Sequence, residues 1–416
     1  MAQTHSKPVI HSLWTPPFKL LCSAVVAFFI GYHLLIPVLP LLLAQHHLPA
    51  PTIASILSIF TVASLACRPV AGYLTDRYSP WGVLSIAIGL FTLSHCLLLY
   101  WPTNTWFWLR LVQGIGFGLM YTSSSRWILL LIPPHRKAEG IGIFSNGMKL
   151  AMAIAPPLGL WLYQHPTWLW NTHHMLPIGV TLLFGMLALC AVLALPWLWP
   201  QSKPSQVSPP VPFTWSTLIH RPACISGILM ATSSLVYGAL IPFAPLIASA
   251  LQVPHVNGFY TLYAITLMAS RSLAGPWADR WGRLPIALPG MAMVSLSVLW
   301  FQHAHHTVTF LLATALYGLA AGTVQPALMA DASDRAQPQE QGAALATFSM
   351  WNDAGIALGT FWMGWAGSLW GYVNALWGIA LLAIIGVLAG AGIIWVEQRQ
   401  PVGKTAGNTE GVSHGH

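Results

Sequence analysis

Charged residues are scarce in this sequence: Asp, Glu, Lys and Arg make up only 6% of its 416 residues. Soluble globular domains carry about 25% charged residues, which cover the surface that faces water. Hydrophobic residues reach 56% here, and the mean hydropathy is +0.64. This balance excludes a soluble protein of two or three domains and predicts an integral membrane protein.

Cysteine is also rare, and the five that occur share no close spacing, so neither a disulfide framework nor a Cys-x-x-Cys site is available. The nucleotide-binding motif Gly-x4-Gly-Lys-Ser/Thr is missing, which excludes ATP as the energy source within this chain. The His-Glu-x-x-His and Gly-x-Ser-x-Gly motifs of hydrolases are missing too. We therefore predict a protein that is not an enzyme, has no cofactor and holds no metal.

Long apolar runs dominate the chain instead. Each is close to the roughly 20 residues that a membrane-spanning helix needs, whereas a β-barrel would show shorter segments of alternating polarity. The twelve runs are 19–43, 52–73, 82–101, 106–128, 138–163, 176–198, 222–250, 256–277, 284–302, 308–328, 342–365 and 373–395. We therefore predict an all-α integral membrane protein with twelve transmembrane helices.

Lysine and arginine are distributed unevenly between the two sets of connecting loops. One set contains neither residue: 44–51, 102–105, 164–175, 251–255, 303–307 and 366–372. Because basic residues accumulate on the cytoplasmic side, we predict an inner (plasma) membrane protein with both termini in the cytoplasm. The net charge of +8 then faces anionic lipid, and no nucleic-acid partner is expected.

The two halves of the chain repeat each other on either side of a proline-rich segment, residues 200–212, with five prolines. A shift of 203 places Arg68, Ala71, Gly72, Asp76 and Arg77 on Arg271, Ala274, Gly275, Asp279 and Arg280. A shift of 204 places Gly114, Gly118, Phe144 and Ser145 on Gly318, Gly322, Phe348 and Ser349, and a shift of 205 places Pro37 and Pro40 on Pro242 and Pro245.

This repeat predicts two six-helix bundles in parallel repeat, at residues 1–199 and 222–396. Residues 200–221 are predicted to form a cytoplasmic linker, and 397–416 a polar cytoplasmic tail. In transporters built from such repeats, the binding site lies between the two halves near the middle of the membrane.

Two loop motifs resemble the Gly-x-x-x-Asp-Arg signature of the major facilitator superfamily, and the resemblance covers nearly the whole chain. They are Gly72-Tyr-Leu-Thr-Asp76-Arg77 and its fuller copy Gly275-Pro-Trp-Ala-Asp279-Arg280-Trp-Gly-Arg283. The first copy departs from the pattern after Arg77. The resemblance implies the major facilitator fold, with these loops latching the two halves on the cytoplasmic side.

Two further motifs are similar to those of proton-coupled exporters in this superfamily. Arg110-Leu-Val-Gln113-Gly-Ile-Gly implies that Arg110 lies in the transport cavity and takes part in proton exchange. In the fifth span, Gly147, Ala151, Ala155, Pro156 and Gly159 form a degenerate copy of the antiporter motif. Small side chains at every fourth position also allow close helix packing, so export and a purely structural role both remain open.

Three charged residues are expected deep inside the spans: Arg110, Lys149 and Asp353. An isolated charge there costs roughly 2.5–3.5 kcal/mol or more, so we expect all three to face the cavity. The shift of 204 aligns Lys149 with Asp353. They either bind the two ends of a zwitterionic or carboxylate solute, or Asp353 carries a proton whose affinity Lys149 tunes, or they serve as structural charges.

His33 lies in the middle of the first span and is a second candidate for carrying the proton. Neutral contacts to the solute are predicted from a set of polar side chains close to these charges: Tyr32, Gln113, Asn146 and Asn352.

These features together predict a proton-driven secondary transporter that exports a small organic solute by alternating access. The solute is expected to be drug-like, or a carboxylate or zwitterionic metabolite, metal chelators included. Expected partners are that solute, protons and the lipid bilayer, and the protein is expected to be a monomer. A proton symporter that imports a metabolite and a membrane sensor that transports nothing remain as alternatives.

The duplicated latch yields a direct test. Replacing Arg77 or Arg280 by Gln removes one of its charges, so we expect most of the solute-driven proton flux in proteoliposomes to disappear while the amount of folded protein stays unchanged. Lys19→Gln, which removes a positive charge from the start of the first span, is the control. Full flux in both arginine variants would exclude the latch.

Overall fold

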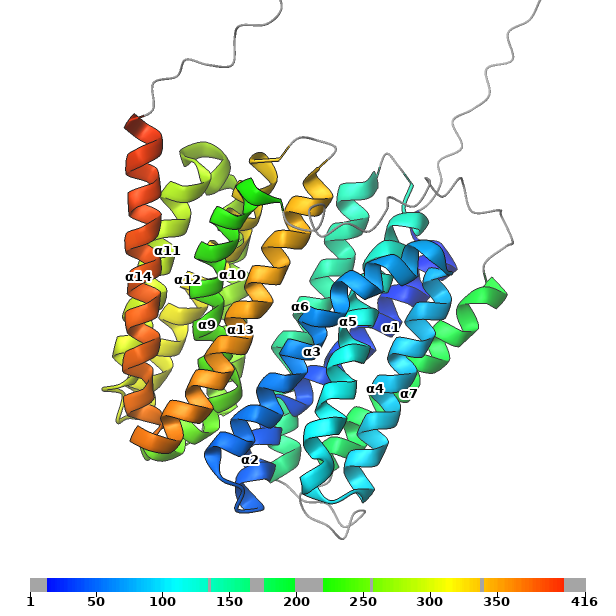
Figure 1. Cartoon of the computed structure of the whole chain (residues 1–416), viewed down its shortest axis with the longest axis horizontal. Helices are drawn as coiled ribbons and strands as arrows, with labels where there is room; N and C mark the ends of the chain where they lie inside the picture. The colour runs from blue at the N-terminus through cyan, green and yellow to red at the C-terminus, as the bar shows by residue number, and fades with distance from the viewer. Residues whose placement is uncertain are drawn as a thin grey trace, which may run out of the picture.

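The computed structural model describes residues 13–133, 136–164, 176–198, 220–254, 257–336 and 340–399. Every regular element within these residues is a helix (Figure 1). The first half contains α1 (Pro16–Leu35), α2 (Val38–Gln45), α3 (Ala50–Arg77), α4 (Pro80–Tyr100), η1 (Thr103–Thr105), α5 (Trp106–Leu131), α6 (Lys137–Gln164) and α7 (Leu176–Leu198). The second half contains α9 (Arg221–Ala250), α10 (Asn257–Trp281), α11 (Arg283–Phe301), α12 (Thr307–Asp334), α13 (Gln341–Trp370) and α14 (Tyr372–Arg399).

Helices α1 and α2 form one span that is interrupted at Ile36 and Pro37. Proline has no backbone N–H to continue the helical hydrogen bonds, and the amide of Ile36 donates to the carbonyl of His33 at 3.3 Å instead. Helix α9 runs without a break through the repeat-equivalent Pro242 and Pro245. With the long helices that follow, the described residues confirm the predicted all-helical class and its twelve spans.

Seven segments of the described residues are long and apolar enough to cross a membrane: Pro16–Gln45, Pro51–Thr75, Pro80–Tyr100, Arg221–Ala250, Arg283–Phe301, Thr307–Asp334 and Tyr372–Val396. Four of the other long helices, α5, α6, α10 and α13, carry Arg110, Lys149, Arg271 and Asp353 respectively. Each of these four helices therefore carries a charged residue within its length.

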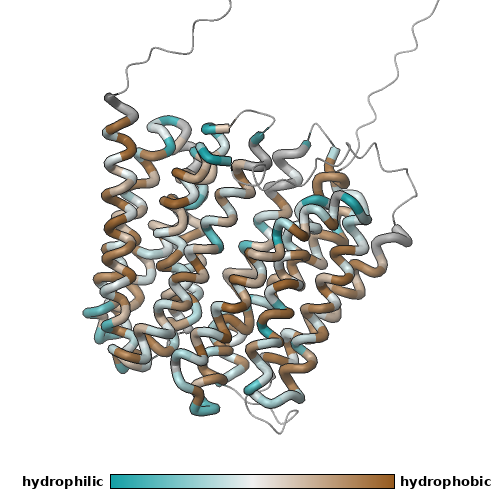
Figure 2. Tube along the Cα trace, in the orientation of Figure 1, coloured by the Kyte–Doolittle hydropathy of each residue, from teal (hydrophilic) through white to brown (hydrophobic). Residues whose placement is uncertain are grey.

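The outer surface of the helices suits a lipid environment. Figure 2 shows hydrophobic residues along the helices and hydrophilic residues gathered towards their ends. On α14, Leu381, Ile385 and Leu388 are each at least half exposed. An exposed apolar face of this kind is stable in contact with acyl chains rather than water.

The helices pack as two groups that lie side by side in Figure 1. In the first group α1 packs on α6 and α7, while α3 and α4 pack on α5. In the second, α9 packs on α13 and α14, while α10 and α11 pack on α12. The groups meet through α3 with α13, α6 with α10, and α2 with α9. The predicted linker lies outside the described residues except at its end.

Apolar contact between the two bundles is concentrated at the end of the molecule remote from the start of α1 and the end of α14. A buried cluster there joins residues of both bundles, including Leu39, Ile53 and Ile247. Gly364 of α13 lies so close to α3 that an added Cβ would be 2.7 Å from the Cα of Ala54. The other large buried cluster of the described residues belongs to the first bundle alone. The bundle interface is therefore sealed at one end.

This seal predicts the effect of enlarging Gly364. Gly364→Val pushes α13 away from α3, so a cysteine introduced by Leu39→Cys in a cysteine-free background should react faster with a membrane-impermeant maleimide. Gly89→Val is the matched control because no other atoms lie within 4 Å of an added Cβ at Gly89. Equal labelling rates in the two valine variants would contradict the role of Gly364.

Candidate functional site

A cavity of about 310 Å³ lies between the two bundles. Helices α1, α3, α5 and α6 of the first bundle and α9, α10, α12 and α13 of the second contribute to its wall. Among the described residues its charged lining consists of Arg68, Arg271 and Asp353, surrounded by serine, tyrosine and phenylalanine side chains. Both halves therefore build one polar chamber, as the repeat predicts.

Asp353 and Arg68 form an ion pair that crosses the bundle interface. The Nη2 of Arg68 on α3 lies 2.5 Å from the Oδ2 of Asp353 on α13. Asn352 donates to the Oδ1 of Asp353 at 3.2 Å and accepts a hydrogen bond from Ser234 at 2.8 Å. The guanidinium of Arg68 also lies over the ring of Tyr121, 4.8 Å from its centroid. The salt bridge, the hydrogen bond from Asn352 and the cation–π contact of Arg68 together hold the ion pair in one position.

Arg271 occupies the repeat-equivalent position on α10, but its partner is neutral. Its guanidinium donates to the Oε1 of Gln325 on α12, and no acidic partner is found for it among the described residues. The stacked rings of Tyr263 and Tyr317, with centroids 5.1 Å apart, line the same part of the chamber. Its charge is therefore available to an anionic group in the cavity.

Arg110 lies next to the main cavity rather than in its wall. Its guanidinium donates to the Oε1 of Gln113 at 2.9 Å and lies 4.3 Å from the centroid of Phe60. The amide of Gln113 is 3.3 Å from the Nδ1 of His95. Arg110, His95 and Tyr32 line a second, smaller cavity of about 40 Å³. A buried polar chain inside the first bundle thus connects α4 with α5.

His33 and Tyr32 both face the main cavity from α1. The Nδ1 of His33 lies 2.9 Å from the carbonyl oxygen of Phe29, to which it donates. The ring of Tyr32 stacks on Phe60 with centroids 5.0 Å apart. The imidazole is therefore held by its own helix, with its other nitrogen free to meet a proton or solute.

Sequence comparison connects this architecture with known proteins. The profile of the Major Facilitator Superfamily matches residues 21–360 and 226–413. The chain belongs to the major facilitator superfamily. It is accordingly a multi-pass membrane transporter, and the predicted membership of this superfamily is confirmed.

Relatives and solved structures share this superfamily's fold. The chain is 22% identical over 372 residues to the staphylopine export protein of Staphylococcus aureus, covering 86% of this chain and 90% of that protein. It is 28% identical over 142 residues to the uncharacterized MFS-type transporter YhcA of Bacillus subtilis, which covers 34% of this chain and 27% of that protein.

Among solved structures, a bacterial homologue of the human lysosomal transporter Spinster, in an inward-facing and occupied conformation, has a TM-score of 0.72 at 13% identity, covering 92% of this chain and 96% of that one. The human organic anion transporter MFSD10 has a TM-score of 0.62 at 18% identity, covering 90% of this chain and 99% of that one. At such identities these structures establish the fold alone.

Two latch arginines of this superfamily member, Arg77 and Arg283, contact residues of their own bundles. Arg77 donates to the hydroxyl of Tyr73 on the same helix at 2.5 Å, and Arg280 is exposed. The Nε of Arg283 lies 3.0 Å from the Oδ2 of Asp334. The surroundings of Asp76, Gly275 and Asp279 lie outside what the structure describes. The latching role of these motifs stays a prediction.

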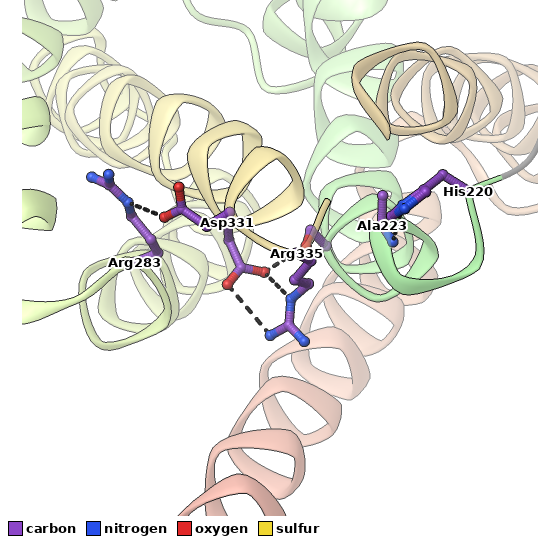
Figure 3. Close-up of polar contacts among 7 residues, drawn as sticks. His220, Ala223, Arg283, Asp331 and Arg335 are labelled. Carbon is purple, nitrogen blue, oxygen red and sulfur yellow. Dashed lines mark hydrogen bonds and ion pairs between the residues drawn. The ribbon is translucent and has the colours of Figure 1, made fainter. Parts of the chain in front are cut away.

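Figure 3 shows the polar network around Arg283 at the ends of α11 and α12. Asp331 accepts hydrogen bonds from the Nε of Arg335 at 2.7 Å and from the hydroxyl of Ser226 on α9 at 2.5 Å. The Nδ1 of His220 accepts the amide hydrogen of Ala223 and caps α9. These contacts fasten three helices of the second bundle together, which suits a bundle that moves as a unit.

The small residues of the fifth span pack α6 against α1. Ala151 and Ala155 are fully or almost fully buried. An added Cβ at Gly159 would lie 2.9 Å from the carbonyl carbon of Leu34, and one at Gly147 would lie 2.7 Å from Val26. The motif therefore produces close helix contact, and Pro156 lies within the unbroken α6.

The structure brings together part of the predicted site. Asp353, Asn352, His33 and Tyr32 line the main cavity, whereas Gln113 is buried inside the first bundle. Lys149 is half-buried on α6 and Asn146 is exposed, and neither is part of the cavity wall.

The partner of Asp353 is Arg68 and not Lys149. The sequence indicated Arg68 and Arg271 only as equivalent positions of the repeat, and the structure shows that both line the cavity. The sequence did contain a signal for this position. Each of the two arginines precedes its latch arginine by nine residues, which places it about 13.5 Å along the helix from the latch loop. His95 had no such signal in the sequence.

The ion pair predicts a stability pattern. Arg68→Gln leaves the buried carboxylate of Asp353 without its counter-charge, and breaking such a pair costs about 3–5 kcal/mol at neutral pH. Adding Asp353→Asn to Arg68→Gln should restore much of the lost stability, because the uncompensated charge is gone. Thermal unfolding of the detergent-purified variants measures this coupling, and additive losses in the double variant would contradict it.

Proposed function

We propose that this protein is a proton-driven exporter of a small organic solute in the inner membrane. One observation carries the proposal: the only acidic side chain in the described lining of the cavity, Asp353, is paired across the bundle interface with Arg68. A proton bound at Asp353 therefore changes a contact between the two moving parts. This is the physical link that coupled transport requires.

The coupling follows from the charge of Asp353. When it is ionised, its attraction to Arg68 holds α13 against α3. Protonation removes that attraction and frees both side chains, so the two bundles separate more easily at this point. A cationic group of a zwitterionic solute competes with the proton for the same carboxylate. Mutually exclusive binding at one carboxylate is the basis of exchange, with the solute leaving as the proton arrives.

The orientation of the molecule supports loading from the cytoplasm. The positive-inside distribution of Lys and Arg predicts that both termini lie in the cytoplasm, and the apolar seal lies at the opposite end of the bundles. The cavity wall extends from the middle of α1 to Met329 of α12, on the cytoplasmic side of this seal. A solute therefore enters from inside the cell in this conformation.

Export is favoured over import by two further features. A relative that is aligned over most of both chains is named as an export protein, and the Arg110 motif resembles that of proton-coupled exporters. The un-neutralised charge of Arg271 in the cavity suits a solute that carries a carboxylate, either as an organic anion or as a zwitterion. The latch loops and the antiporter-like packing of α6 are the gating elements in this scheme.

Purified protein in proteoliposomes tests the proposal. Pools of small metabolites and drugs should elicit proton flux in the wild type, and Asp353→Asn should abolish it because the exchangeable proton site is lost. Lys19→Gln, which changes a charge outside the cavity wall, is the control. Proton flux that survives in Asp353→Asn would indicate that His33 carries the proton instead. Uptake of the solute by intact cells but not by everted vesicles would identify an importer.

A further inference from the structure

The repeat relates two contacts between the bundles to each other. A shift of 203 places Arg68 on Arg271, and a shift of 204 places Lys149 on Asp353. The helices that carry them also correspond, since α3 meets α13 on one side of the cavity and α10 meets α6 on the other. The position that mirrors the Arg68–Asp353 ion pair is therefore the position of Arg271 and Lys149.

The two mirrored positions differ in charge. On one side a guanidinium meets a carboxylate 2.5 Å away. On the other side, a guanidinium on α10 and an ammonium on α6 occupy the equivalent positions of two helices that are in contact. Neither Arg271 nor Lys149 has an acidic partner among the described residues, and Gln325 supplies only a neutral acceptor to Arg271. The side of Arg271 and Lys149 therefore lacks the carboxylate that the mirrored pair contains.

The surroundings allow a solute to supply that group. Arg271 and Gln325 face the main cavity, and so does Met152, which lies on α6 three residues after Lys149. A carboxylate between the two cations would replace their repulsion with two charge-assisted interactions. The tyrosine rings beside Arg271 offer contact to the remainder of the molecule.

We propose that Lys149 and Arg271 form the subsite for the carboxylate of the transported solute, which takes the place that Asp353 holds in the mirrored pair. This assignment rests on the transport function proposed above and specifies the chemical class of the solute as an organic carboxylate. Because one cation comes from each bundle, the bound carboxylate also draws α6 and α10 together. Solute binding thus favours closure of the cavity around it.

Thermal unfolding of the full-length protein in detergent tests the subsite with defined probes. These are phenylacetate, N-acetylphenylalaninate and glutarate, each compared with its uncharged amide, and inorganic phosphate. At least one carboxylate should raise the unfolding midpoint while its amide does not. Lys149→Gln and Arg271→Gln should each lower the affinity for that carboxylate, so that about tenfold more of it is needed for the same midpoint shift. This is the loss expected for one charged hydrogen bond. Lys149→Arg should retain it, as should the control Lys19→Gln.

A charge reversal tests the symmetry argument without any ligand. Lys149→Asp supplies the lacking carboxylate from the protein itself, so the unliganded variant should unfold at a higher temperature than Lys149→Asn and should no longer respond to carboxylates. A lower midpoint for Lys149→Asp than for Lys149→Asn overturns the proposal. So does a response to carboxylates that is unchanged in Lys149→Gln and Arg271→Gln, or a response to phosphate that exceeds that to every carboxylate.

These outcomes are separable from failure of proton-driven export. Carboxylate binding that depends on Lys149 and Arg271, in a protein that shows no proton flux, supports the subsite and rejects proton drive. Proton flux driven by an uncharged or cationic solute, retained in both glutamine variants, rejects the subsite and keeps proton drive.

Discussion

A carboxylate buried in the middle of a membrane protein has to be neutralised, and here the neutralising group belongs to the other half of the molecule. The pair formed by Arg68 and Asp353 spans the interface at 2.5 Å. The stability of the buried charge therefore depends on the relative position of the two bundles. Any change in the protonation of Asp353 changes how firmly α13 is held to α3. The pair lies in the wall of the polar chamber between the bundles.

The fold is nearly symmetric, but its charges are not. Equivalent helices line the two sides of the cavity, and equivalent arginines face it, yet Arg68 meets a carboxylate, whereas a lysine holds the equivalent position on the side of Arg271. In a scaffold with perfect symmetry the two sides of the cavity would be equivalent for a solute. In the proposed subsite the difference in charge favours one side for a carboxylate, because that side lacks an anion of its own.

Close packing allows the bundles to move as units around this chamber. Gly159 brings α6 against α1 within the first bundle. In the second bundle the network of Asp331, Arg335 and Ser226 ties the ends of two helices together. Such rigid bodies transmit a local change at an ion pair to the whole interface, since tightly packed interiors deform little.

The sequence by itself determined the helical class, the twelve spans, the two-fold repeat and the membership of the superfamily, because hydropathy and spacing are properties of the chain in one dimension. It also indicated Asp353, His33 and Tyr32 as cavity residues. Only the tertiary structure decided that Arg68 is the partner of Asp353. The alignment of Lys149 with Asp353 shows that they are equivalent, and residues related by a two-fold axis between the bundles lie on opposite sides of the cavity. Equivalence in the repeat therefore separates this pair in space, and each side chain meets a helix that the sequence order does not reveal.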